Sequence, residues 1–181
     1  MNQTKFQSTL VKLFGLVAIF ALILIDQGTK HLATLYLKNQ AAVPIIDNVF
    51  YLYYLENKGA AFGILQGQKI FFLLLTVCIT LAACYIYYRL PATKHFFLLR
   101  LTVILLISGA IGNFIDRVMQ TYVVDFLYFS PIDFPVFNFA DICVTFAEIF
   151  LVIDILFVYR NDDFKEVFAR HGNHRNDSGN A

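Results

Sequence analysis

The sequence predicts an all-α integral-membrane protein, a bundle of four transmembrane helices with a small extracytoplasmic β element between the first two. Three observations lead to this fold class. The chain of 181 residues is 59% hydrophobic and only 15% charged, which is more apolar than a soluble domain of this length. Four apolar segments approach the ~20 residues that a helix needs to cross the hydrocarbon layer. Basic residues gather beside the ends of these segments.

The first predicted span covers about residues 10–36. Its uncharged run, Leu13–Ile25, follows Lys5 and Lys12 and therefore resembles a cleavable signal peptide. The run is followed by the polar sequence Asp26–Lys30 instead of a small-residue cleavage site. We therefore expect a retained helix that continues beyond this polar sequence.

The other three predicted spans are residues 70–90, 96–115 and 139–159. Four spans place both termini on one side of the membrane, and an excess of basic residues identifies that side as the cytoplasm. These basic residues are Lys5 and Lys12, then Arg89, Lys94 and Arg100, then Arg160, Lys165, Arg170 and Arg175.

The remaining segments complete a single-domain organisation. In the first outer connection, Val49–Leu55 is rich in aromatic and β-branched residues and predicts a short strand outside the membrane. Residues 161–181 are polar and predict a disordered cytoplasmic tail. Residues 1–160 are then one membrane domain.

Charge and cysteine usage exclude several classes of protein. The formal net charge is +1, so the chain lacks the basic footprint of a protein that binds nucleic acid. Cys78, Cys84 and Cys143 lie in apolar segments without CxxC or Cys/His spacing, so we expect no disulfide, no metal and no cofactor. Ser108 has no histidine in a matching span, and His31 and His95 form no HExxH motif, which disfavours serine and metal hydrolases.

Ionisable side chains inside apolar spans need an explanation, because each costs about 2.5 to 3.5 kcal/mol at the helix centre. Asp26 and Lys30 lie four residues apart on one helix face. They are equally consistent with a self-neutralising pair and with a scaffold beside a polar site. In the outer connection, Asn57–Gly63 is rich in small residues. A simple turn after the strand explains this segment as well as an Asn57 amide that orients a substrate does.

The end of the third span combines small and polar residues. Gly109, Gly112, Asn113 and Asp116 fall at helical spacings, so the glycines admit a neighbouring helix and the polar side chains face it. Arg117 follows at the helix C-terminus, where a cation complements the macrodipole. Packing explains the glycines and a structural role suits Asp116 with Arg117, but packing does not explain two polar groups on one face.

The last span opens with a candidate N-cap, Asn138, three residues before Asp141. A carboxylate in the first turn is favourable for structural reasons alone. Asp125 lies in an apolar aromatic stretch, and the prolines between the two acids allow the chain to fold back. Two carboxyl groups held close in a low-dielectric site cannot both ionise readily, which supplies the acid and the base of an amide hydrolase. From the residues alone, Asp116 or Asp133 would serve equally well as the partner of Asp141.

Five motifs, in their order and spacing, resemble the lipoprotein signal peptidase (signal peptidase II) family. The motifs are Asp26–Lys30, Asn57–Phe62, Gly109–Arg117, Val123–Phe126 and Phe137–Asp141. The resemblance implies an intramembrane aspartyl endopeptidase in which Asp125 and Asp141 are the catalytic pair. It implies that the substrate-binding or supporting residues are Asp26, Lys30, Asn57, Gly109, Asn113, Asp116, Arg117 and Asn138.

The resemblance also implies the reaction and its location. The substrates are prolipoproteins with a diacylglyceryl-modified cysteine, and the peptide bond before that cysteine is cut. We expect a monomer in the bacterial cytoplasmic (inner) membrane, surrounded by membrane lipid, with its active site toward the extracytoplasmic face and sensitivity to globomycin-type cyclic peptides. Two positions depart from the family pattern: Ser108 replaces a common glycine, and Cys143 replaces a small residue or serine. Neither is a proposed catalytic carboxylate, so we expect both to be tolerated.

Two other classes of protein fit the residues. A small proton-coupled transporter would relay protons through Asp26, Asp116 and Asp141. The clustering of these acids toward the outer face disfavours a relay, although Glu148 and Asp154 run against that trend. A non-catalytic membrane scaffold would leave Asp125 and Asp141 dispensable.

Overall fold

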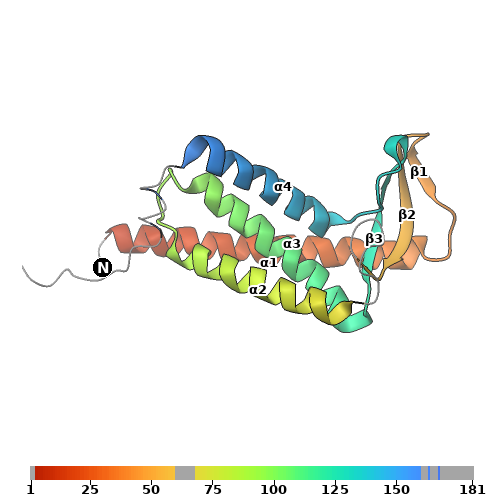
Figure 1. Ribbon diagram of the computed structural model, residues 1–181, viewed down its shortest axis with the longest axis horizontal. Helices are drawn as coiled ribbons and strands as arrows, with labels where there is room; N and C mark the ends of the chain where they lie inside the picture. The colour runs from red at the N-terminus through yellow and green to blue at the C-terminus, as the bar shows by residue number, and fades with distance from the viewer. Residues whose placement is uncertain (1–2, 60–67, 160–162, 164–166, 168–181) are drawn as a thin grey trace, which may run out of the picture.

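The computed structural model describes residues 3–59, 68–159, 163 and 167, and it shows four α-helices with a small sheet at one end (Figure 1). The helices are α1 (Gln3–Leu37), α2 (Lys69–Arg89), α3 (Phe97–Gln120) and α4 (Phe139–Ile153). Within the described residues, three segments are long and apolar enough to cross a membrane: Phe6–Leu37, Ile70–Arg89 and Phe97–Gln120. Many of their large apolar side chains are exposed, as expected for helices that face lipid.

Three helices differ from their predicted lengths. α1 begins at Gln3, ahead of the predicted start at about residue 10. α3 continues to Gln120, beyond the predicted end at residue 115, so Asp116 and Arg117 are helical. α4 has 15 residues, and a π-helical turn, Asp154–Val158, follows it. The fourth predicted span is therefore a shorter α-helix with a π turn at its end.

The sheet joins two segments that are distant in the sequence. Its antiparallel strands lie in the order β1 (Val43–Ile46), β2 (Phe50–Asn57) and β3 (Val123–Phe129). β2 confirms the strand predicted at Val49–Leu55, whereas β3 was not predicted as a strand. Because β3 pairs with β2, the segment that follows α1 and the segment that follows α3 meet in one sheet at one end of the helices.

α3 is the central helix of the bundle, since it packs against α1, α2 and α4. Away from the sheet, apolar side chains of the helices form the larger core cluster, which includes Tyr87, Val103, Ile104 and Ile107. A smaller cluster joins α1 to β3 and consists of Ala33, Leu37, Val124 and Phe126. The buried charged side chains Asp26 and Lys30 of α1 lie, along the helix, between Ile19 of the larger cluster and Ala33 of the smaller one.

The predicted tail, residues 161–181, contains only two described residues. Asp163 Oδ1 lies 2.8 Å from His95 Nε2, and Val167 is buried in the larger core cluster. Both residues therefore lie against the end of the bundle. The rest of the tail, and residues 60–63 of the Asn57–Gly63 motif, lie outside the described residues.

Candidate active site

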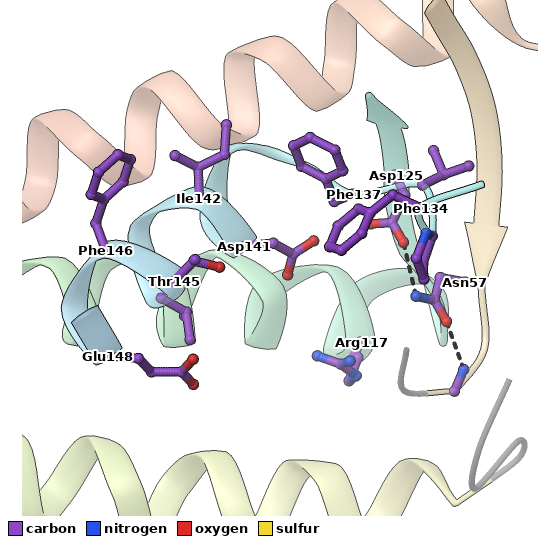
Figure 2. A pocket seen from close by; sticks show the side chains of 14 residues that line it. Asn57, Arg117, Asp125, Phe134, Phe137, Asp141, Ile142, Thr145, Phe146 and Glu148 are labelled. Carbon is purple, nitrogen blue, oxygen red and sulfur yellow. Dashed lines mark hydrogen bonds between the residues drawn. The ribbon is translucent and has the colours of Figure 1, made fainter. Parts of the chain in front are cut away.

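A pocket of about 490 Å³ lies where the sheet meets α3 and α4. It is lined by Asn57 from β2, Asp125 from β3, Arg117 from α3 and Asp141 from α4, with apolar side chains around them. Figure 2 shows the carboxyl groups of Asp125 and Asp141 turned toward the same space. The structure therefore brings together two acids that are distant along the chain.

Strand pairing places Asp125. Asp125 lies opposite Leu55 in the β2–β3 register, so Asn57, two residues further along β2, is its diagonal neighbour on the same face. The Asn57 amide nitrogen donates a hydrogen bond to Asp125 Oδ2 at 2.8 Å, while its oxygen accepts one from the Gly59 N–H at 3.0 Å. Asn57 therefore forms the predicted turn and also contacts Asp125, while its predicted contact with a substrate stays a prediction.

A helix cap places Asp141. The Asn138 side chain accepts a hydrogen bond from the Asp141 N–H at 3.0 Å, and Asp141 Oδ2 accepts one from the Asn138 N–H at 3.0 Å. This capping box confirms Asn138 as the predicted N-cap. The other carboxylate oxygen, Asp141 Oδ1, accepts a hydrogen bond from the Asn113 amide at 2.8 Å.

One buried amide links the two acids. The Asn138 Nδ2 group donates to Asp125 Oδ1 at 2.6 Å and to Asn113 Oδ1 at 3.2 Å. Backbone hydrogen bonds between Phe137 and Leu127 hold the returning chain against β3, which is the fold-back expected from the prolines. Asn138, which is fully buried, thus fixes Asp125 relative to the first turn of α4.

Burial, and after it the negative charge of Asp141, raise the pKa of Asp125 to about 7, against hydrogen bonds from Asn57 and Asn138 that lower it. Within the described part of the chain, no Lys, Arg or His side chain forms an ion pair with either acid. A carboxyl group with this pKa exchanges a proton near neutral pH, as acid–base catalysis requires.

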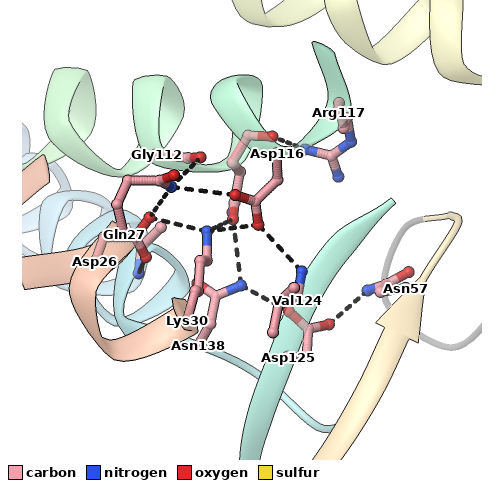
Figure 3. Close-up of polar contacts among 12 residues, drawn as sticks. Asp26, Gln27, Lys30, Asn57, Gly112, Asp116, Arg117, Val124, Asp125 and Asn138 are labelled. Atoms are coloured by element: carbon pink, nitrogen blue, oxygen red, sulfur yellow. Dashed lines mark hydrogen bonds and ion pairs between the residues drawn. The ribbon is translucent and has the colours of Figure 1, made fainter. Parts of the chain in front are cut away.

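A second buried carboxylate pair lies beside the pocket, and Figure 3 shows its contacts. Lys30 Nζ lies 2.9 Å from Asp26 Oδ2 and 3.2 Å from Asp116 Oδ2. Gln27 donates to both carboxylates, at 3.0 and 3.1 Å. All three charged side chains are buried, so these groups form a charge cluster, defined here as Asp26, Lys30 and Asp116.

The charge cluster anchors the segments that carry the two acids. Asp116 Oδ2 accepts a hydrogen bond from the Val124 N–H at 3.1 Å, next to Asp125. Asp26 Oδ1 accepts one from the Ala140 N–H at 2.9 Å, next to Asp141. Lys30 also donates to Asn113 Oδ1 at 2.9 Å. The cluster therefore fixes the backbone on both sides of the pocket.

Two glycines of α3 allow this close approach. A Cβ atom at Gly112 would overlap the Asp26 carboxylate, and one at Gly109 would lie 2.5 Å from the Ala140 carbonyl oxygen. Both glycines therefore belong to the packing of α3 against α1 and α4, as the packing explanation predicted.

Asp116 and Arg117 face different partners. Asp116 joins Lys30, whereas the Arg117 guanidinium lies 5.0 Å from the centre of the Phe72 ring and donates to the Asn113 carbonyl at 3.3 Å. Arg117 also lines the pocket. The joint structural role considered for these two residues is therefore divided: Asp116 supports the backbone, and Arg117 supplies positive charge at the pocket wall.

Several other acidic and polar residues can now be placed. Asp133 is exposed and accepts a hydrogen bond from the Tyr128 hydroxyl at 2.8 Å, so it does not share the pocket. Asp154 is buried and accepts a hydrogen bond from the Thr102 hydroxyl at 3.1 Å. It lies 13 residues after Asp141, or roughly 20 Å along a helix. Gln27 was not identified from the sequence as a partner of the buried carboxylates. Its position beside Asp26 in an apolar span was the signal that could have identified it.

No group of three His, Cys, Asp or Glu side chains with the arrangement of metal ligands occurs in the described ranges. Cys143 is buried beside Gly109, where a small side chain suits the contact between α3 and α4. The polar groups that line the pocket include the carboxyl groups of Asp125 and Asp141, the Asn57 amide and the Arg117 guanidinium.

Comparisons with known proteins agree with this arrangement. A family model described as signal peptidase (SPase) II matches residues 18–157. Lipoprotein signal peptidase of Streptococcus thermophilus is 45% identical over 137 residues, which cover 76% of this chain and 88% of that protein. The corresponding protein of Clostridioides difficile is 42% identical over 142 residues, which cover 78% and 94%.

A solved structure described as a bacterial membrane enzyme at 1.9 Å resolution is similar to this fold. Its TM-score is 0.69 at 31% sequence identity, and the match covers 81% of this chain and 94% of that one. With the three membrane-length helices, this similarity identifies a multi-pass membrane protein. The predicted family is confirmed by the extent of the matches, and the chain belongs to the signal peptidase II family of peptidases.

Proposed function

We propose that this protein removes signal peptides from prolipoproteins as an intramembrane aspartyl endopeptidase, with Asp125 and Asp141 as its catalytic residues. The observation that carries the proposal is the shared pocket, in which both carboxyl groups bond to Asn138 and, among the residues that the structure describes, neither forms an ion pair with a Lys, Arg or His. The names of the relatives, lipoprotein signal peptidases, supply the substrate class.

The two acids take different roles in the resting enzyme. Asp125, with a pKa raised to about 7 by burial and by Asp141, holds the proton. Both acids accept hydrogen bonds on both oxygens, but only Asp141 lies in the first turn of α4, where the helix dipole favours negative charge, so Asp141 is the ionised partner.

The reaction follows from this proton distribution. Asp141 removes a proton from a water molecule as the water oxygen bonds to the scissile carbonyl carbon, and Asp125 transfers its proton to the carbonyl oxygen. When the tetrahedral intermediate collapses, the carbon–nitrogen bond breaks and the nitrogen takes the proton from Asp141. Asp125 regains a proton from the intermediate, so both acids return to their initial states.

The remaining residues hold this geometry. The charge cluster positions the backbone beside each acid. Asn57, Asn113 and Asn138 orient the carboxyl groups. Arg117 at the pocket wall is placed to stabilise negative charge on the substrate.

The proposed orientation in the membrane places the sheet and the pocket at the extracytoplasmic face of the bacterial inner membrane, with both termini in the cytoplasm. α4 and its π turn form the fourth span. The substrate is then itself a membrane-spanning segment, and its diacylglyceryl-modified cysteine lies at the outer boundary of the lipid. A monomer contains all the proposed catalytic groups, and cyclic peptides of the globomycin type would compete for the pocket.

The test is cleavage of a diacylglyceryl-modified prolipoprotein by the purified protein in detergent. We expect cleavage before the modified cysteine, inhibition by globomycin, and no cleavage of the unmodified precursor. Asp125→Asn and Asp141→Asn should each lower the rate by roughly 10²- to 10⁴-fold, while Asp133→Asn, on the exposed loop, serves as the matched control. Substantial cleavage by both catalytic-site variants would remove the two acids from the mechanism.

A further inference from the structure

The α4 wall of the pocket contains two exposed polar side chains that the proposed reaction does not use. Thr145 and Glu148 lie on α4 and line the pocket, and Figure 2 shows both directed to the same side of the helix. Within the described residues, neither side chain has a hydrogen-bond or ion-pair partner. Their neighbours Phe146 and Ile149 are exposed apolar side chains, which suit lipid.

An unpaired acid in an apolar helix is costly unless it faces water or a ligand. Glu148 lies on the pocket side of α4, so a bound substrate is the group within its reach. A carboxyl group accepts hydrogen bonds in either protonation state, and a threonine hydroxyl accepts them as well. The α4 wall of the pocket therefore presents two hydrogen-bond acceptors to a bound substrate.

The spacing of these acceptors matches an extended peptide. Thr145 and Glu148 follow Asp141 by four and seven residues, which places them about 6 and 10 Å farther along the helix axis. An extended chain advances about 3.3 Å per residue. The two side chains therefore lie opposite the second and third residues beyond a peptide bond held at Asp141.

A peptide bond inside a helix has to leave that helix before a water molecule can attack its carbonyl carbon. The extended residues then expose N–H groups without helical partners, which is unfavourable in an apolar environment. Arg117, the cation of the pocket wall, has only donors and cannot accept these hydrogen bonds. Acceptors on α4 would compensate for the lost helical bonds.

Successive N–H groups of an extended chain point to opposite sides, so the third residue before the cut, and not the second, turns its N–H to the same side as the scissile carbonyl. We propose that Glu148 binds the backbone N–H group of the signal peptide three residues before the cut, and so holds that segment extended. This inference rests on the proposed function, which places the signal-peptide side of the cut deeper in the membrane. Glu148 is then a residue that positions substrate, and it takes no part in proton transfer.

Substrates with a single backbone change test the inference directly. In a synthetic diacylglyceryl-modified peptide, the amide N–H three residues before the cut is replaced by an ester oxygen. We expect kcat/KM to fall about tenfold with the unaltered enzyme, the effect of one lost hydrogen bond of this strength. With Glu148→Leu the amide peptide should be cleaved about tenfold more slowly, and the ester should cause no further loss.

Matched variants separate positioning from structure. Glu148→Gln keeps an acceptor and should retain most of the activity, and Ile149→Leu on the neighbouring exposed face should behave as the unaltered enzyme. Thr145→Val should leave the effect of the ester at the third residue unchanged. If the unaltered enzyme cleaves the amide and ester peptides equally, or if the Glu148→Leu and ester effects multiply, the positioning role is overturned while the proposed function stands. Failure to cleave the amide peptide at all would overturn both.

Discussion

The described residues include two neighbouring pairs of carboxyl groups, Asp26 with Asp116 and Asp125 with Asp141. The pairs differ in the group that contacts both acids. In the charge cluster, Lys30 Nζ contacts both Asp26 and Asp116. In the pocket, Asp125 accepts a hydrogen bond from the side-chain amide of Asn138, and Asp141 accepts one from the backbone N–H of the same residue. The same residue type is thus placed beside a cation in one region and beside an amide in the other.

This difference separates structural acids from reactive ones. A cation compensates buried negative charge, so the cluster acids can remain ionised and accept backbone hydrogen bonds. An amide orients a carboxylate but does not neutralise it, so two acids around an amide are most stable when one holds a proton. The charge cluster therefore supports the fold, and the pocket retains a transferable proton.

Removing the cation is the strongest way to test this comparison. In Lys30→Met, Asp26 and Asp116 lose the positive partner that they share, and we expect the free energy of unfolding to fall by about 3 to 5 kcal/mol. Cleavage should fall too, because the cluster anchors the backbone beside both catalytic acids. Equilibrium unfolding in detergent and the cleavage assay measure the two effects.

The control is a change in the sign of the effect that Asp116→Asn has on the free energy of unfolding. Asp116→Asn should destabilise the unaltered protein, because it removes a partner of Lys30, but should stabilise the Lys30→Met protein, because it removes an uncompensated charge. Asp125→Asn should change stability by less than about 1.5 kcal/mol in either protein, since one neutral hydrogen bond is at stake. If Asp116→Asn had the same sign in both proteins, the cluster would not depend on charge compensation.

The parts of this arrangement that depend on local sequence could be predicted. The Asp26–Lys30 contact follows from spacing on one helix, and the Asn138 cap follows from its place before the last helix; both are present. The family could be predicted too, because five motifs keep their order along the chain. Local geometry and motif order are properties that a single sequence records.

The parts that depend on contacts between distant segments could not. β3 was not predicted because Val123–Phe129 reads equally well as an apolar stretch at the membrane, and only its pairing with β2 makes it a strand. That pairing decides that Asp125, rather than Asp133, meets Asp141. The choice of Lys30 rather than Arg117 as the partner of Asp116 likewise depends on how α1 packs against α3.

The pH dependence of cleavage tests the pocket half of the comparison. The pKa of Asp125 is raised to about 7 by burial and by Asp141, so Asp125 holds its proton below pH 7 and loses it above. If the reaction requires that proton, kcat/KM should fall about tenfold per pH unit above about pH 7, since the protonated fraction falls by that factor. Rates measured between pH 5 and 9 would show this limb.

Unfolding has to be separated from deprotonation in that experiment. Thermal unfolding measured over the same pH range should show that the protein remains folded where its activity falls, and activity should return when the pH is lowered again. A rate that stayed level from pH 6 to pH 9 would contradict a proton held by Asp125. Asp125 and Asp141 would then both be ionised, like the two acids of the charge cluster.

The smallest expected effect concerns a single amide. Asn57 donates to Asp125 Oδ2 and thereby lowers the pKa of Asp125, because the hydrogen bond favours the charged form. In Asn57→Ala the pKa should rise, and the alkaline limb of kcat/KM should move upward by about one pH unit or less, which corresponds to about 1.4 kcal/mol or less. The rate at pH 6 should change little, because Asp125 is already protonated there.

Asn57 also accepts the Gly59 N–H, so the turn needs its own control. Serine at this position can accept that N–H but is too short to donate to the carboxylate as Asn57 does. Asn57→Ser should therefore move the alkaline limb as far as Asn57→Ala does. A shift in the alanine variant alone would assign the effect to the turn, and a downward shift in both would mean that Asp125 is tuned by something other than its amide neighbours.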